Sequence, residues 1–191
     1  MENKNDYIAT AFLSCSLRTE DIPFVDYVAR ILKAYKINPV GTVGKNYAAP
    51  ENPVVSMTKK IKEYDFLVVA ATPRYFSKDI QNNKDSKSIS EQLHAEAGIA
   101  KGLNKPVIAF IQGDTNPGNF ISQITQYIIL DGTIEDYNKK KKLIYSLIDN
   151  TFKKVQELKG NKKLKTIGNI VVGGLAVYGT IKLLEKLFSE N

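Results

Sequence analysis

The chain has 191 residues, of which 43% are hydrophobic and 25% charged, values typical of one soluble globular domain. A single cysteine, Cys15, excludes an internal disulfide framework and fits a reducing compartment. Together with the single histidine it offers no metal-ligand cluster. Residues 1–6 are polar and lack the apolar core of a signal peptide, so we expect a cytoplasmic domain.

Apolar runs and helical periodicity alternate along the chain. They predict five strands, at residues 7–13, 37–43, 65–72, 106–111 and 127–130. They predict helices at residues 24–35, 53–64, 88–103, 120–124 and 134–158. Residues 73–88 are polar and are predicted to form a long loop. This order predicts an α/β fold, a flavodoxin-like, doubly wound parallel five-stranded sheet in residues 1–133, which a basic amphipathic helix in residues 134–160 closes.

The net charge of +7 is concentrated towards the end of the chain, with ten lysines between Lys139 and Lys165 against two acids. Such a belt is either a solvated helix face or a contact for an anionic membrane surface. Nucleic acid is the weaker alternative, because few aromatic residues interrupt the belt and no known binding motif is present.

Residues 161–191 form a Gly-rich hydrophobic tail, and residues 166–181 carry no charge. As a helix this run would reach about 24 Å, and Leu183 and Leu184 would extend it. The tail predicts a C-terminal hydrophobic helix with three alternatives: membrane insertion through residues 166–184, self-association into a homo-oligomer, or packing back onto the domain.

Three polar loops, after Leu13, Val43 and Thr72, follow predicted strands, so they should gather at the carboxyl edge of the sheet. The helix that carries Glu96 begins at the same edge. Small residues flank Glu96 at Ala97, Gly98 and Ala100, and we expect them to leave a slot against which a flat ligand could lie. A carboxylate beside such a slot can attack an anomeric carbon, stabilise an oxocarbenium-like transition state or hold a ribose hydroxyl. The alternative is an ordinary surface glutamate.

Other side chains in these loops are candidates for holding a nucleotide. Hydroxyls, amides and a guanidinium could bind phosphate or ribose there. The candidates are Ser14, Ser16, Arg18, Asp65, Thr72, Arg74, Tyr75 and Gly98. For Asp65, at the start of a strand, a structural role is the alternative. His94 should point away from Glu96, because residues two apart on a helix face different directions. The chain has neither a nucleophile triad, nor a Gly-rich phosphate loop, nor a dinucleotide fingerprint.

Residues 11–21, with the sequence AFLSCSLRTED, and residues 65–76, with the sequence DFLVVAATPRYF, resemble the first and third strands of a Toll/interleukin receptor (TIR) domain and the loops after them. Glu96 then falls where TIR NAD hydrolases carry their catalytic glutamate. The chain lacks the tryptophan common near that helix.

The stretch around Glu96 also resembles the nucleoside 2-deoxyribosyltransferases, whose pattern matches Glu96, Gly98, Ala100 and residues 105–107 (KPV). Residues 87–90 (KSIS) replace the Asp-Ser-Gly element of many of those enzymes. The two resemblances span about residues 7–130. They imply N-glycosidic chemistry with Glu96 as the catalytic residue.

The TIR resemblance further implies an enzyme that cleaves or cyclises NAD as its substrate, needs no separate cofactor, self-associates and acts in antiviral defence. The alternatives are a non-catalytic nucleotide sensor and a metabolic deoxyribosyltransferase.

Overall fold

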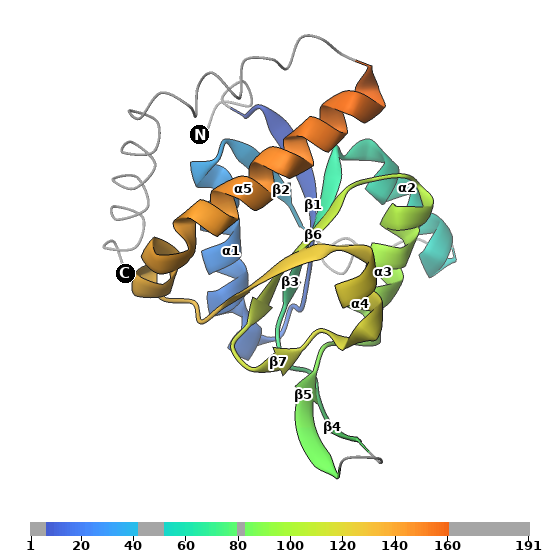
Figure 1. Ribbon diagram of the computed structural model, residues 1–191. Coiled ribbons are helices and arrows are strands. Elements are labelled where there is room, and N and C mark those ends of the chain that lie inside the picture. Colours follow the sequence, from blue (N-terminus) through green and yellow to red (C-terminus); the bar gives the residue numbers. More distant parts are fainter. Residues whose placement is uncertain (1–6, 42–51, 80–82, 161–191) are drawn as a thin grey trace.

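The computed structural model describes residues 7–41, 52–79 and 83–160, and its centre is a five-stranded parallel sheet (Figure 1). The strands lie in the order β2-β1-β3-β6-β8, and every neighbouring pair is parallel. Their bounds are β1 Ala9–Cys15, β2 Ile37–Val40, β3 Phe66–Ala71, β6 Val107–Gln112 and β8 Gln126–Leu130. Counted along the chain, the parallel strands have the order 2-1-3-4-5, which is the flavodoxin-like order. The predicted α/β fold is therefore confirmed.

Helices cover both faces of the sheet, as Figure 1 shows. Alternate residues of each central strand face opposite layers, because the side chains of a strand alternate. Phe66, Val68 and Ala70 pack with α1 Ile22–Ala34 and α5 Ile134–Lys159. Leu67, Val69 and Ala71 pack with α2 Pro53–Glu63, α3 Glu91–Gly102 and α4 Gly118–Ile124. The predicted closing helix thus shares the core of the sheet that it closes.

The first strand extends further than the sequence indicates. It was predicted to end at Leu13, but β1 continues to Cys15. Ser14 pairs with Val69 of β3, so it is a buried strand residue and not a loop residue. The loop at the end of β1 therefore begins at Ser16. This places the crevice at the point where the chain reverses its strand order, between β1 and β3.

The prediction of a loop over residues 73–88 is wrong. This segment forms an antiparallel hairpin, β4 Tyr75–Asp79 with β5 Lys84–Ser88, and β5 also pairs with β7 Thr115–Asn116. The hairpin projects from the carboxyl edge of the sheet (Figure 1). Backbone pairing and a hydroxyl contact between Ser77 and Ser86, 2.9 Å, hold it. The polar sequence hid it, because no apolar alternation marks either strand.

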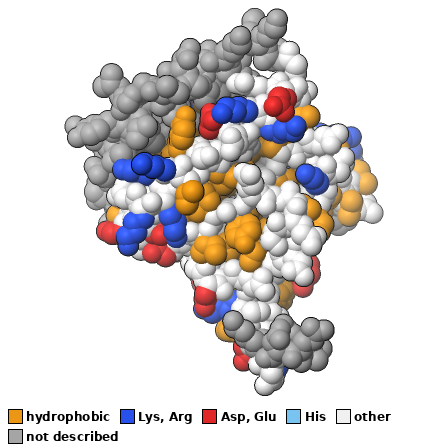
Figure 2. All heavy atoms as spheres, in the orientation of Figure 1, with side chains coloured by type: hydrophobic (Ala, Val, Ile, Leu, Met, Phe, Trp, Pro, Cys, Tyr) orange, Lys and Arg blue, Asp and Glu red, His pale blue; other side chains and the backbone are white. Residues whose placement is uncertain are grey.

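Two predicted segments fall outside the described residues. They are the loop after Val43 as far as residue 51 and the whole tail at residues 161–191, which includes the candidate membrane segment at residues 166–184. Among the described residues, no helix is long and apolar enough to cross a membrane. Figure 2 shows apolar side chains on the face that carries β8, where Tyr127, Ile129 and Leu143 are exposed. The homo-oligomer stays a prediction.

Asp65 lies at the amino edge of the sheet, immediately before β3. Its carboxylate accepts a hydrogen bond from the backbone N–H of Thr10, at 2.9 Å, and pairs with Lys159 at the end of α5. The residue therefore joins β1, β3 and α5 at the edge opposite the crevice.

We expect Asp65→Ala to lower the free energy of unfolding by about 1–2 kcal/mol, because the Thr10 amide and the Lys159 ammonium lose their acceptor. Urea denaturation measures the change. Asp85→Ala, at an exposed site on the hairpin, is the matched control and should stay within about 0.5 kcal/mol of wild type. Equal stability of the two variants would contradict the structural role of Asp65.

Candidate functional site

Glu96 lies on the first half of α3, and its side chain is 0% exposed. The hydroxyl of Ser14, on β1, donates to Oε2 of Glu96. The amide of Gln92, one helical turn earlier on α3, donates to Oε1 at 3.1 Å. These two hydrogen bonds tie the carboxyl group to the end of β1 and to its own helix.

Burial raises the pKa of Glu96 above the ordinary range of a glutamate. The hydrogen bonds from Ser14 and Gln92 act in the opposite direction, because they stabilise the ionised form. Neither partner carries a charge. A carboxyl group whose pKa lies above its ordinary value can serve as a general acid, and once ionised it can act as a nucleophile.

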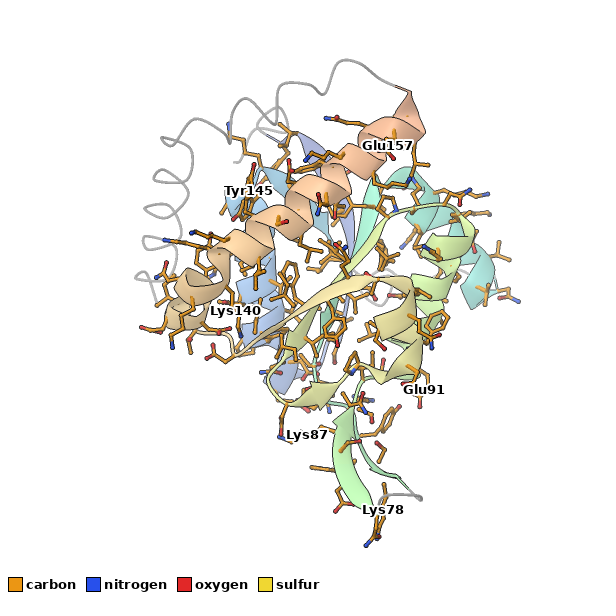
Figure 3. The ribbon with its side chains drawn as sticks, viewed as in Figure 1. Lys78, Lys87, Glu91, Lys140, Tyr145 and Glu157 are labelled. Atoms are coloured by element: carbon orange, nitrogen blue, oxygen red, sulfur yellow. The ribbon has the colours of Figure 1, made fainter. Side chains whose placement is uncertain are left out.

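A cleft of about 370 Å³ lies beside this group, at the carboxyl edge of the sheet. The loop after β1, the start of the hairpin and the first turn of α3 line it. Its residues are Cys15, Ser16, Leu17, Arg18, Arg74, Tyr75, Ser90, Glu91, Gln92 and Leu93. Figure 3 shows Glu91 at the end of α3 that faces the hairpin. Glu96 itself does not line the cleft, but Gln92, which donates to its carboxyl group, does.

Arg18 fixes the floor of the cleft. Its guanidinium donates to both carboxylate oxygens of Asp21, at 2.7 and 3.1 Å, and to the carbonyl of Pro73 after β3, at 2.6 Å. Burial raises the pKa of Asp21, but the hydrogen bonds from Arg18, Ser16 and Thr72 outweigh it and hold that pKa below the usual range. Arg18 and Asp21 thus form a clamp between the loop after β1 and the end of β3.

The structure brings most of the predicted site residues together. Glu96 and Ser14 are hydrogen-bonded, and Ser16, Arg18, Arg74 and Tyr75 line the cleft. Thr72 is buried behind the cleft and supports Asp21. Arg74 is exposed, with its guanidinium carbon 5.9 Å from the ring centre of Tyr75. Asp65 lies at the opposite edge and does not take part.

The expected slot beside Gly98 is not open. A β-carbon at position 98 would lie 3.3 Å from Cζ of Phe120 on α4, so an aromatic ring of the protein already occupies that face. Ala97 and Ala100 are buried against the sheet. The small residues therefore allow α3 to pack closely on α4 and on the sheet, and Gly98 does not line the cleft.

Sequence reasoning missed Gln92. It precedes Glu96 by four residues, and this spacing places two side chains on one helix face. The spacing of four residues was the signal from which Gln92 could have been predicted as a partner of Glu96. His94 packs instead against Phe120, with ring centres 5.9 Å apart, and burial lowers its pKa. It is therefore not a partner of Glu96.

Two other features bear on what the site can hold. Within the part of the chain that the structure describes, no group of three or more His, Cys, Asp or Glu side chains could hold a metal ion.

A larger hollow of about 660 Å³ lies at the amino edge, between α3, α4 and α5, and contains none of the predicted site residues.

The clamp generates a prediction. Asp21→Asn should lower the free energy of unfolding by about 1–3 kcal/mol, because Arg18, Ser16 and Thr72 lose a charged acceptor. The loss should shrink as the pH falls below about 3.9, since a carboxylate with a lowered pKa stabilises the fold only while it is ionised. Denaturant titrations between pH 3 and 7 measure it. Glu20→Gln, which removes an exposed ion pair of Arg18, is the control and should cost less than about 1 kcal/mol.

In contrast to Asp21→Asn, Glu96→Gln should raise the free energy of unfolding at neutral pH. A carboxyl group whose pKa is raised by folding destabilises the folded state above that pKa, and the penalty disappears below about pH 4.3. The variant should therefore melt at a higher temperature than wild type at pH 7, by about 2–4 °C for each kcal/mol gained. At pH 4 the two should melt at the same temperature. Thermal melts at the two pH values test this. A variant that melts below wild type at pH 7 would instead show that the charged form stabilises the fold.

No family model and no curated protein matches the chain. Among solved structures, the CMP N-glycosidase BcmB from Clostridium botulinum is 16% identical, with a TM-score of 0.44, over 70% of this chain and 98% of that one. The flavoenzyme NAD(P)H:(acceptor) oxidoreductase FerB from Paracoccus denitrificans is 12% identical, with a TM-score of 0.46, over 78% and 98%. Similarity at this level does not assign a family, so the TIR and deoxyribosyltransferase resemblances stay predictions.

Proposed function

We propose that the chain is an enzyme of N-glycosidic bonds that acts on a nucleotide or nucleoside and uses Glu96 at the sugar. The observation that carries the proposal is the position of Glu96. It is a buried carboxyl group held by two neutral donors, one of which, Gln92, lines the cleft at the carboxyl edge of a doubly wound sheet. Ligands of such sheets bind in this crevice.

The proposed chemistry runs in two steps. Ionised Glu96 forms a bond to the anomeric carbon while the bond to the base breaks, and the base leaves with that electron pair. A purine or pyrimidine base then gains a proton from solvent, whereas nicotinamide, bonded through a cationic nitrogen, leaves neutral without one. Water then attacks the same carbon, releases the sugar and returns the carboxylate. Ser14, fixed within the sheet, orients the reacting carboxyl group throughout.

The cleft supplies contacts of the kind that a nucleotide needs. The exposed Arg74 can pair with a phosphate group, and the ring of Tyr75 offers a face for a base. Arg18 is less suited to a phosphate, because Asp21 already occupies its guanidinium. This division favours Arg74 as the cation that meets the ligand.

The finer proposal, NAD as substrate and a role in antiviral defence, rests on the TIR resemblance alone. Other nucleotides also carry a glycosidic bond and a phosphate and would fit the contacts offered by Arg74 and Tyr75. A panel of nucleotides is therefore the way to identify the substrate.

A second candidate is a non-catalytic nucleotide sensor with the same cleft. The observation that favours it is the complete burial of Glu96, which leaves no carboxylate oxygen in contact with the cleft. Binding of a nucleotide without release of its base would support this candidate.

We expect the wild-type chain to release free base from at least one member of a panel of NAD, ribonucleoside and deoxyribonucleoside 5′-monophosphates and the corresponding nucleosides. Glu96→Gln should reduce the rate by about a thousandfold or more, since it removes the nucleophile. Chromatography measures the released base, and calorimetry measures binding. Glu63→Gln, an exposed glutamate at the end of α2, is the matched control and should keep the wild-type rate.

Equal rates of base release in wild type and Glu96→Gln would exclude the proposed role of Glu96. If a nucleotide of the panel binds but none releases its base, the non-catalytic sensor would be the better description of the protein.

A further inference from the structure

Gln92 stands between Glu96 and the cleft. Gln92 is an exposed residue and lines the cleft, while Glu96, to which its amide donates, is 0% exposed. A ligand that enters the cleft therefore meets the Gln92 amide before it can meet Oε1 of Glu96.

The two donors to Glu96 differ in their freedom to move. Ser14 is a fully buried strand residue near the carboxyl end of β1, with a short side chain. Gln92 has a long side chain at the protein surface, and rotation about its side-chain bonds can carry the amide into the cleft. One hydrogen bond is thus fixed, and the other can be given up without moving the backbone.

We propose that Gln92 is a positioning residue that covers Glu96 in the resting protein and yields its place on Oε1 to a hydroxyl group of the ligand's sugar. This inference rests on the proposed function of the site. The exchange follows from the cost of leaving a buried carboxylate oxygen without a hydrogen-bond donor, which is larger for a charged group than for a neutral one. A sugar hydroxyl is a donor that can replace the amide.

The inference can be tested without any substrate, by labelling carboxyl groups with a water-soluble carbodiimide and glycine ethyl ester. Trypsin releases residues 88–101 as one peptide that contains both Glu91 and Glu96. The exposed Glu91 is labelled in every variant, so it serves as an internal standard. Tandem mass spectrometry separates the two positions.

In wild type we expect Glu96 to remain essentially unlabelled while Glu91 reacts. In Gln92→Ala the labelling of Glu96 relative to Glu91 should rise about tenfold or more, because the cover is gone. Gln92→Asn should behave in the same way, since its amide is one methylene shorter. Gln123→Ala, an exposed glutamine on α4, is the control for an unrelated amide and should leave Glu96 protected.

Ser14→Ala separates covering from hydrogen bonding. This substitution also removes one hydrogen bond from Glu96, but Ser14 is fully buried within β1 and does not line the cleft. Glu96 should therefore stay protected in this variant. Protection of Glu96 in both Gln92 variants, or equal labelling in Ser14→Ala and Gln92→Ala, would overturn the proposal, with thermal melts confirming that each variant is folded.

A second readout applies to the substrate found by the panel. If Gln92 is displaced before the chemical step, Gln92→Ala should lower KM about tenfold or less and leave kcat nearly unchanged. A fall in kcat at constant KM would instead mean that Gln92 acts in the reaction. Because the labelling needs no turnover, its outcome stands even if the panel yields no substrate.

Discussion

The hydrogen bond from Ser14 to Glu96 joins the sheet to the helix that carries the candidate chemistry. A carboxyl group without solvent contact needs donors, and here a strand residue of β1 supplies one of the two. The position of α3 over the end of β1 is therefore coupled to the state of Glu96. Any change that moves α3 also moves the carboxyl group, and any change in its protonation alters the contact that holds α3.

The second constraint is the order of the strands. Because β1 and β3 are neighbours and leave the sheet at the same edge, Ser16, Arg18 and Pro73 meet there although 55 residues separate Arg18 from Pro73. The clamp between Arg18 and Asp21 fixes the loop on one side of the cleft, and the first turn of α3 forms the other side. The cleft is thus a consequence of topology: the clamp of Arg18 and Asp21 holds one side of it, and the hydrogen bond between Ser14 and Glu96 holds the helix that forms the other side.

The sequence predicts the sheet because its buried strands are continuous apolar runs, such as residues 66–71, which are entirely buried. It places Glu96, Ser16, Arg18, Arg74 and Tyr75 at one edge, because parallel strands end together. It misses the hairpin, whose strands are polar apart from Tyr75 and Phe76, show no apolar alternation and pair through their backbones. It misreads Gly98, because a small residue permits close packing as readily as ligand contact, and only the position of Phe120 distinguishes the two. The structural role of Asp65 likewise follows from its place before β3, at the edge opposite the cleft.

Two buried acids in this small region show why Glu96 is a candidate for chemistry and Asp21 is not. Asp21 lies against a guanidinium, and its hydrogen bonds hold its pKa below the usual range, so its charge contributes to stability. Glu96 has only a hydroxyl and an amide as hydrogen-bond donors, and its pKa is raised, so its charge opposes folding at neutral pH. A glutamine at position 96 could make contacts of the same length without that cost. The raised pKa of Glu96 thus offers no stabilising reason for a carboxylate at this position, and we look for its use in the adjacent cleft, which its partner Gln92 lines.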